Sequence, residues 1–205
     1  AELAYARANK AAVFVTPSGE RALEALAMWW RARLNCVVVG VTGSSGKTTT
    51  KEMCACVLRA KYKTFATEGN LNSTLGGPLT VLACPEDAEA LVVEMGMSGM
   101  HEIETIARVA KPHIGIITNV GTAHIGLLGS RLNIARAKSE LVSALAKQAK
   151  NALGIEPCAL LWGQDDYTPW IAANVAKPAG VRTLTFGTSA SDDASCTDVE
   201  LDGVG

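Results

Sequence analysis

A glycine-rich stretch with one lysine is the feature of this sequence best suited to chemistry. Residues 40–50 read GVTGSSGKTTT, so glycines and serines separate an apolar run from Lys47 and three threonines. The stretch nearly fits the phosphate-binding pattern G-x-x-x-x-G-K-[ST], but the pattern's first glycine would fall at Val41, and the chain has Gly40 instead. Glycines let a backbone approach an anion closely, and N–H groups at a helix N-terminus favour negative charge. The stretch therefore predicts a phosphate cradle; the alternative is a glycine-rich turn that binds nothing.

The neighbouring sequence fits such a loop. Residues 36–42 are predicted to form a buried parallel strand, and residues 47–59 a helix, so the glycines lie between a strand and a helix start. In this arrangement Lys47 would contact the outer phosphates of a nucleotide, and the Thr48 hydroxyl would hold Mg²⁺.

Three polar side chains are expected at the same edge of the sheet. Glu94 closes the apolar run ALVVE, Asn119 ends the run at 113–119, and His124 follows in the loop NVGTAHIG. Carboxyl ends of parallel strands meet at one edge, which is where such sheets bind ligands. We expect Glu94 to be a metal-holding carboxylate and His124 a ligand or polar anchor. An ordinary loop carboxylate and a structural histidine are the alternatives.

Lys138 is unusual for its position on a predicted helix at residues 131–150. It lies four residues after Ile134 and three before Leu141, on the apolar stripe of that helix. Such a lysine either extends its ammonium to water along the helix surface or points inward, toward the sheet edge that carries the predicted phosphate loop and Glu94. We call this edge the active edge. Both readings stay open on the pattern alone.

A polar, turn-forming stretch at residues 67–78, TEGNLNSTLGGP, lies between two ordered elements. Its asparagines and glycines are typical of a surface loop, and equally of a loop that lines a cleft with amide donors.

The whole pattern alternates strands with helices. Strands are predicted at 36–42, 62–67, 90–95, 113–119, 158–162 and 181–186, and helices at 18–34, 47–59, 76–84, 99–110, 131–150 and 166–175, with a polar loop from 187 on. This rhythm predicts an α/β fold in which a mostly parallel sheet is covered by helices on both faces.

Composition narrows the class of protein. The 205 residues are 48% hydrophobic with a net charge of −1, which permits a sizeable core and disfavours nucleic-acid binding. The sequence has no apolar run long enough for a membrane span and starts without an apolar signal core. Six cysteines without a C-x-x-C pair indicate free thiols in a reducing compartment, so a cytoplasmic location is expected.

Five motifs carry a resemblance to a known family. In order along the chain they read GVTGSSGKTTTKEM, TEGNLNSTLGGPLT, VVEMGMSGMHEIETIA, ITNVGTAHIGLLGS and IARAKSEL. Their order and spacing resemble the central, P-loop NTPase-like ATP-binding domain of the Mur ligases, from about residue 12 to about residue 187. The family's loop looks like G-x-T-G-x-x-G-K-T, which the early Gly40 matches.

The resemblance implies ATP and Mg²⁺ as cofactors and a role for each matching residue. The implied ATP-binding residues are Gly43, Ser44, Ser45, Gly46, Lys47, Thr48, Thr49, Asn70 and Asn119. The implied metal ligands are Thr48, Glu94, His124 at a second Mg²⁺, and Lys138 if CO₂ carbamylates it. The implied catalytic residues are Lys47, His124 and Lys138, and Asn72 would lie near the substrate.

The implied reaction is an ATP-dependent ligation in peptidoglycan precursor synthesis. Of the Mur ligases, the motifs most resemble the enzyme that joins D-alanyl-D-alanine to UDP-N-acetylmuramoyl-tripeptide through an acyl phosphate. The ligase is expected to be a monomer. Another Mur ligase or a folylpolyglutamate synthetase is the alternative within the superfamily. A P-loop small-molecule kinase and a non-catalytic nucleotide-binding regulator are alternatives from other classes, but the sequence shows no arginine-rich lid loop for a kinase.

The domain organisation expected from the resemblance is incomplete. Residues 1–34 would be the end of an N-terminal domain and a connector helix, and residues 35–205 the central domain, incomplete at its C-terminus. The family's C-terminal domain would be absent, so the segment alone is not expected to ligate. Gly163 also departs from the family, because an asparagine that contacts adenine would stand there.

Overall fold

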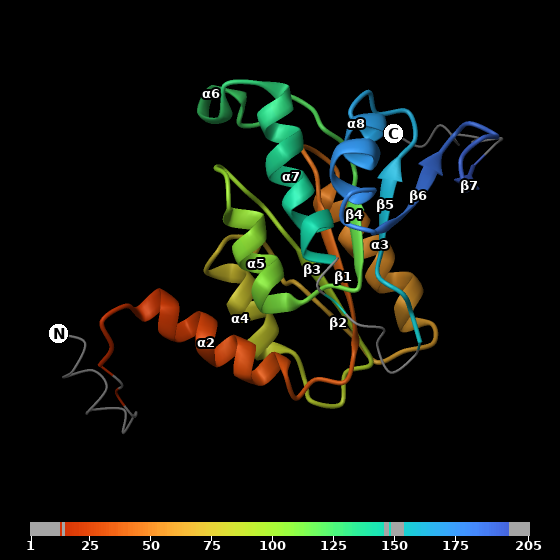
Figure 1. Cartoon of the computed structure of the whole chain (residues 1–205). Helices are drawn as coiled ribbons and strands as arrows, with labels where there is room; N and C mark the ends of the chain where they lie inside the picture. The colour runs from red at the N-terminus through yellow and green to blue at the C-terminus, as the bar shows by residue number, and fades with distance from the viewer. Residues whose placement is uncertain (1–12, 14, 146–147, 149–153, 197–205) are drawn as a thin grey trace, which may run out of the picture.

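A computed structural model describes residues 13, 15–145, 148 and 154–196 of the chain. The described residues form one seven-stranded sheet in the order β2-β3-β1-β4-β5-β6-β7, in which each adjacent pair runs parallel (Figure 1). The strands are β1 (Val37–Thr42), β2 (Thr64–Ala66), β3 (Ala90–Glu94), β4 (Ile114–Ile117), β5 (Cys158–Trp162), β6 (Arg182–Gly187) and β7 (Ala194–Ser195). The helices are α2 (Gly19–Arg31), α3 (Lys47–Arg59), α4 (Gly76–Ala83), α5 (Glu102–Ala110), α6 (Ile125–Leu128), α7 (Arg131–Leu145), α8 (Thr168–Ile171) and the π-helical turn η1 (Ala172–Ala176).

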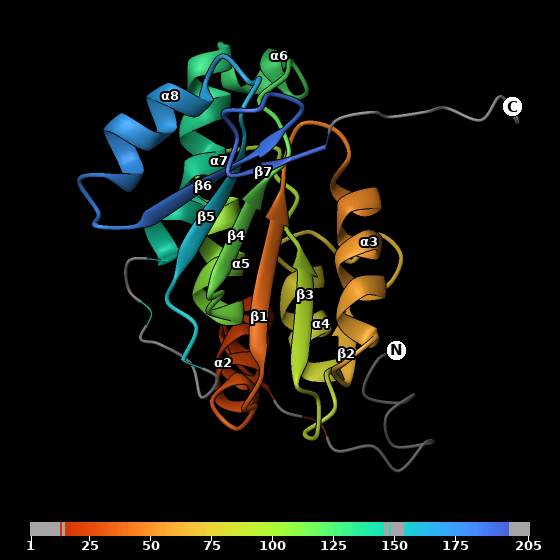
Figure 2. The ribbon, with the colours of Figure 1, turned by 90° about the vertical axis from the view of Figure 1, so that its right-hand side faces the viewer.

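Helices cover both faces of this sheet, as the sequence predicts. Helix α3 packs on β1, β2 and β3, whereas α2, α4, α5 and α7 pack on one another over the opposite face. Figure 2 shows α3 apart from the layer that contains α2, α5 and α7. Alternate strand residues feed the two sides: Val38 and Leu91 pack into the larger core, and Val39 and Val92 into the core under α3. Parallel strands that are covered on both faces have continuous apolar sequences, and β1 and β3 are buried along their whole length.

Helix α2 is tied firmly to the rest of the fold. Its N-cap Ser18 accepts a hydrogen bond from the Arg21 backbone N–H, as a serine at that position should. At its other end the guanidinium of Arg31, which is 7% exposed, donates to the carbonyl oxygens of Ala110 and Lys111 at the end of α5. A cation at a helix C-terminus satisfies carbonyl groups that have no partner within the helix. Residues 19–31 therefore pack as part of this domain.

The structure corrects several predicted boundaries. The helix predicted from residue 99 begins at Glu102, because His101 takes φ +67° and ends the preceding loop. The helix predicted at 166–175 is split into α8 and η1, and the loop predicted after residue 187 contains the short strand β7. Helix α6 was not predicted. The helix predicted at 131–150 is confirmed to Leu145, and most of its remainder lies outside the described residues.

A search of the described residues finds no helix that is long and apolar enough to cross a membrane.

Candidate active site

The loop between β1 and α3 is held open by a close approach that only glycine allows. A Cβ atom on Gly43 would lie 1.7 Å from the Thr118 hydroxyl oxygen, because the loop passes directly over the end of β4. That hydroxyl donates to the Ser45 carbonyl oxygen at 2.6 Å. Gly46, with φ +74°, then turns the chain into α3. The glycines predicted to shape a phosphate cradle are thus required by its geometry.

Asn119 fixes the same loop from the neighbouring strand. Its side-chain oxygen accepts the backbone N–H groups of Ser44 and Ser45, each at 3.1 Å, and its amide nitrogen donates to the Ser45 hydroxyl at 2.8 Å. The Ser44 hydroxyl in turn accepts the Gly121 N–H at 2.9 Å. Asn119 therefore holds the loop in shape, and its predicted contact with ATP stays a prediction.

Lys47, Thr48 and Thr49 open helix α3. The Lys47 ammonium donates to the Gly43 carbonyl oxygen at 3.0 Å, so the side chain folds back over the loop. Thr48 and Thr49 are exposed on the first helical turn. Three N–H groups at a helix start, a lysine and a threonine hydroxyl are the donor set that binds a phosphate with its Mg²⁺.

Two buried oxygen atoms beside the loop lack a partner among the described residues. Glu94 is 1% exposed, and its Oε1 accepts from the Asn72 amide at 2.8 Å, but its Oε2 is unpaired. The hydroxyl of Thr42 is likewise buried and unpaired. The two residues end β3 and β1, which are neighbours in the sheet. An unpaired buried carboxylate oxygen is costly unless a cation binds it, so Glu94 fits a Mg²⁺ ligand.

Lys138 is buried rather than extended into water, and its role at this edge of the sheet stays a prediction. Its side chain is 1% exposed on α7, and no hydrogen bond or ion pair joins it to another of the described residues. Burial, with a smaller effect from the positive charge of Lys47, lowers the pKa of Lys138 to about 7. The electrostatic effect of Lys47 links Lys138 to the phosphate loop, and a neutral amine is the form that reacts with CO₂.

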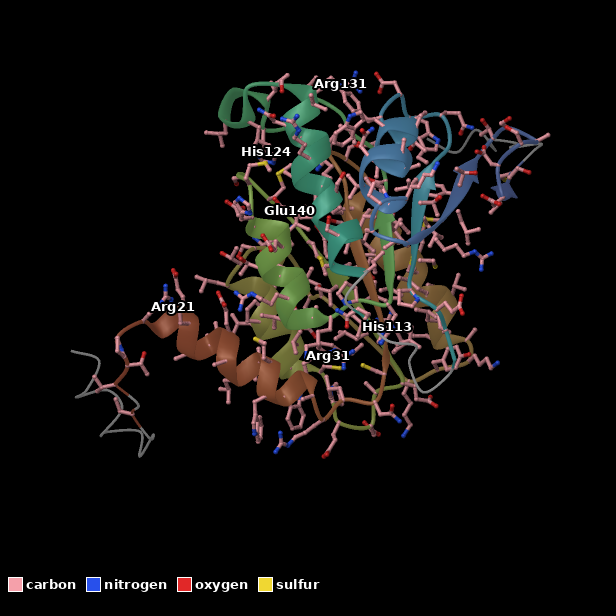
Figure 3. All side chains as sticks on the ribbon, viewed as in Figure 1. Arg21, Arg31, His113, His124, Arg131 and Glu140 are labelled. Atoms are coloured by element: carbon pink, nitrogen blue, oxygen red, sulfur yellow. The ribbon has the colours of Figure 1, made fainter. Side chains whose placement is uncertain are left out.

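Unlike Glu94 and Lys138, His124 and Asn70 are exposed side chains. His124 is exposed with φ +65° at the start of α6, and Asn70 is exposed in the 67–78 loop. In the part of the chain that the structure describes, no hydrogen bond joins either side chain to Glu94 or Lys138. Figure 3 shows His124 at the same end of the molecule as Arg131, far from Arg31 and His113 at the other end. His124 thus lies toward the end of the molecule that carries Arg131, and its predicted role as a metal ligand stays a prediction.

Sequence reasoning missed three residues at this edge. Lys51 is 1% exposed and donates to the Thr67 carbonyl oxygen at 2.7 Å. Asp165 accepts the N–H groups of Val120 and Tyr167 with its two oxygens. Arg131 forms a bidentate pair with the exposed Asp166 and lies over the Tyr167 ring. Only Lys51 carried a signal, because it lies one helical turn after Lys47.

Gly163 departs from the expected asparagine for a structural reason. A Cβ atom at this position would lie 1.8 Å from the Asp192 carboxylate, which fills the space beside it. Asp192 is held there by the Gln164 amide at 2.7 Å and by the Ser189 N–H at 3.1 Å. An asparagine at 163 would therefore require the Asp192 side chain to move.

One hollow in the described structure lies away from this edge. It has a volume of about 500 Å³ and is lined by residues of α2, α5, α7, α8 and η1, among them Met28, Glu104, Glu140 and Trp170, but by none of the predicted site residues. Within the described residues no cluster of three or more His, Cys, Asp or Glu side chains could hold a metal. The active-edge assignment therefore depends on convergent hydroxyl, carboxylate and amide groups, which suit Mg²⁺ with its retained waters.

Comparison with known proteins agrees with this geometry. The sequence profile of the Mur ligase middle domain matches residues 41–204. The chain belongs to the Mur ligase middle-domain family. Its resemblance to the Mur ligases, predicted from five motifs, is thereby confirmed, as is the predicted α/β fold.

Individual Mur ligases show how far the similarity extends. A UDP-N-acetylmuramoyl-tripeptide–D-alanyl-D-alanine ligase of Bacillus subtilis is 41% identical over 92% of this chain, and one of Mycobacterium tuberculosis is 36% identical over 80%. MurF from Acinetobacter baumannii has a TM-score of 0.81 at 34% identity, with 92% of this chain and 39% of that chain covered. MurF from Thermotoga maritima, solved in complex with ADP, has a TM-score of 0.73 at 34% identity, with 86% of this chain and 38% of that chain covered.

The chain spans less than half of these Mur ligases. It covers 38% of the Bacillus subtilis relative and 30% of the Mycobacterium tuberculosis one. Escherichia coli FolC shares the fold at a TM-score of 0.55 but is only 15% identical.

Proposed function

We propose that this chain is the ATP-binding part of a ligase that joins D-alanyl-D-alanine to UDP-N-acetylmuramoyl-tripeptide in peptidoglycan precursor synthesis. The observation that carries the proposal is the unpaired, 1% exposed carboxylate oxygen of Glu94 beside the phosphate loop. The relatives named for this reaction are up to 41% identical to the chain, whereas the folylpolyglutamate synthetase-like neighbours are about 15% identical. The whole reaction would require the further parts that the longer relatives have.

The loop residues would bind and orient ATP. Backbone N–H groups from Gly46 to Thr49 and the Lys47 ammonium would hold the β- and γ-phosphates. Asn119, which accepts the N–H groups of Ser44 and Ser45, would keep the loop in shape. Mg²⁺, with Thr48 and Glu94 as its ligands, would offset the negative charge that develops on the phosphates. Asn70 would lie near the nucleotide, and Asn72, which orients Glu94 by a 2.8 Å hydrogen bond, near the muramoyl substrate.

The chemistry needs no covalent attachment to the protein. A carboxylate is a poor electrophile, so its oxygen first attacks the γ-phosphorus of ATP, ADP leaves, and an acyl phosphate forms. The amine of D-alanyl-D-alanine then attacks the acyl carbon, phosphate leaves, and the amine loses a proton. The protein contributes position and positive charge, chiefly through Lys47.

Lys138 and His124 are proposed to hold a second Mg²⁺. Reaction of the neutral Lys138 amine with CO₂ would form an N–C bond and release a proton, which leaves a carbamate with two oxygen ligands. The burial of this lysine and its pKa of about 7 favour the neutral amine that this step requires. His124, at the start of α6, would be the other protein ligand of this site.

Residues 1–34 are proposed to lead from an N-terminal domain into the central domain at residues 35–205, and the ligase to act as a cytoplasmic monomer. The packing of α2 against α4 and α5 supports a fixed connection at this boundary.

Phosphate release tests the proposal directly. In the full-length protein that contains this chain, ATP hydrolysis to phosphate should depend on UDP-N-acetylmuramoyl-tripeptide and D-alanyl-D-alanine together. Lys47→Ala should abolish it and leave the circular dichroism spectrum unchanged. Phosphoryl transfer to hydroxyl acceptors without a carboxylate would instead support a small-molecule kinase and contradict the ligase.

A further inference from the structure

Lys51 is a buried lysine that the proposed mechanism leaves without a function. It lies on α3 and is 1% exposed, one turn beyond Lys47. Its ammonium donates to the Thr67 carbonyl oxygen at 2.7 Å, and it also pairs with Glu52, whose side chain is 58% exposed. Removing an ammonium from water is expensive, and a well-packed apolar residue usually fills such a space at lower cost. The burial of a charged donor at this position therefore points to a task for it.

The partner of Lys51 leads directly to the proposed metal carboxylate. Thr67 follows β2 and is itself 1% exposed. Its hydroxyl oxygen accepts the backbone N–H of Glu94 at 3.0 Å, and its own N–H donates to Val92 O at 2.9 Å. One residue thus connects the lysine on α3 to the end of β3.

The same residue starts the loop that orients the Glu94 carboxylate. Residues 67–72 run from Thr67 to Asn72, whose amide donates to Glu94 Oε1 at 2.8 Å and whose carbonyl accepts the Gly96 N–H at 2.7 Å. The backbone of Glu94 and its side chain are therefore both held by a segment that Lys51 anchors at its first residue.

On the basis of these contacts we propose that Lys51 is a positioning residue that ties the phosphate-loop helix to Thr67 and so holds Glu94 for Mg²⁺. The proposal rests on the proposed nucleotide and metal site. Because Lys47 and Lys51 lie on the same helix, the phosphate loop and the carboxylate are connected as one unit through α3. The action of Lys51 is indirect, since Thr67 lies between its ammonium and Glu94.

A measurement of nucleotide affinity, rather than of the turnover rate, distinguishes the positioning role of Lys51 from a general effect on folding. In the full-length protein, the dissociation constant of ADP would be measured by titration calorimetry with saturating Mg²⁺ and with EDTA. The dissociation constant in EDTA divided by the dissociation constant with Mg²⁺ reports how much the metal site strengthens ADP binding. For Lys51→Met, which keeps most of the volume, we expect that ratio to fall about tenfold while ADP affinity in EDTA is retained, since a charged hydrogen bond is lost but the loop is intact.

Three further variants sharpen the test. Glu52→Gln removes only the exposed ion-pair partner and should leave the ratio unchanged. Thr67→Val removes the hydroxyl that accepts the Glu94 N–H and should lower the ratio as Lys51→Met does, whereas Thr67→Ser should not. The Thr67 pair decides the question if Lys51→Met does not fold.

The outcomes distinguish the inference from the function on which it rests. An unchanged ratio in Lys51→Met and Thr67→Val, or equal weakening with Mg²⁺ and with EDTA, would overturn the positioning role. If the wild-type protein binds ADP with the same dissociation constant with Mg²⁺ and with EDTA, the proposed metal site itself is contradicted. Metal-coupled ADP binding without carboxylate-dependent phosphate release would contradict the ligase assignment and leave the role of Lys51 standing.

Discussion

Buried polar groups without partners are the most informative residues in this structure. Glu94 Oε2 and Thr42 Oγ1, at the ends of neighbouring strands, have none among the described residues. Each unpaired group costs free energy in the fold alone, on the order of 1–3 kcal/mol. Their common position at the carboxyl edge is explained if ligands that bind there provide the missing interactions.

Glu94→Gln separates the stability of the fold from binding at this site. The substitution keeps the shape of the side chain and removes the negative charge, so stability in urea should be equal or higher, while Mg²⁺-dependent phosphate release should fall at least ~100-fold. The measurement is urea unfolding beside phosphate release in the full-length protein. Retained activity with lowered stability would show that the carboxylate is structural.

Lys138→Ala tests carbamylation. If the buried amine carries CO₂ as a carboxylate-like group, the alanine variant should lose activity and regain part of it with acetate or propionate, which can enter the vacated space. Arg136→Ala, on the exposed side of the same helix, serves as the control and should not respond. Full activity of Lys138→Ala without added carboxylate would remove the idea.

Gly43→Ala tests the cradle geometry. The added Cβ would lie 1.7 Å from the Thr118 hydroxyl oxygen, so the loop must shift and ADP binding should weaken by at least ~100-fold. Gly19→Ala is the matched control, because nothing lies within 4 Å of the added atom and alanine favours a helix. Tight ADP binding by Gly43→Ala would show that the loop does not depend on this contact.

At the scale of elements, the sequence predicted the fold better than the edges of its elements. Continuous apolar runs predicted β1, β3 and β4, since strands buried on both faces have no other pattern. The start of α5 was wrong because its cap comes from another helix: the Glu140 carboxylate on α7 accepts the N–H groups of His101 and Glu104 at 2.7 and 3.0 Å. A partner 36 or more residues away leaves no local signal.

In the predicted site, too, positions set by the local sequence pattern were predicted, and contacts between different elements were not. Glycine spacing and strand ends predicted Gly43, Lys47 and Glu94 at one edge, because topology alone brings these positions together. The inward direction of Lys138 remained open, since a helical stripe does not say how far an ammonium reaches. Lys51 was missed because its partner, Thr67, belongs to another element.

His113 links two strands and should make stability depend on pH. It precedes β4, is 8% exposed, and its Nδ1 accepts the Val38 N–H at 3.0 Å, which requires an unprotonated nitrogen. Burial, with a smaller effect from Arg31, lowers its pKa from 6.5 to about 4. Between these values the unfolded chain binds a proton that the folded chain does not, so stability is complete above pH 6.5 and falls toward pH 4.

The expected loss is about 3 kcal/mol at most, from the size of the pKa change. His113→Asn, whose side-chain oxygen can accept the same hydrogen bond without titrating, should flatten the curve of unfolding free energy against pH. An identical slope in the variant would show that carboxylates produce the dependence instead.

At the scale of the whole molecule, one edge of one parallel sheet collects the chemistry. β1, β3 and β4 end there with Thr42, Glu94 and the Thr118-Asn119 pair, and α3 and α7 bring Lys47 and Lys138 to it. At the opposite end, Arg31 joins α2 to the end of α5, and His113, just before β4, accepts the Val38 N–H of β1 (Figure 3). Among the residues that the structure describes, the buried side-chain atoms without a partner belong to Thr42, Glu94 and Arg131.

A crystal structure of the full-length protein with ADP and Mn²⁺ in place of Mg²⁺ tests the central claim most directly. The account predicts an anomalous manganese peak bound by Thr48 Oγ1 and Glu94 Oε2, with the β-phosphate of ADP enclosed by residues 43–48. A manganese peak away from Glu94, or ADP bound outside the loop, would contradict it.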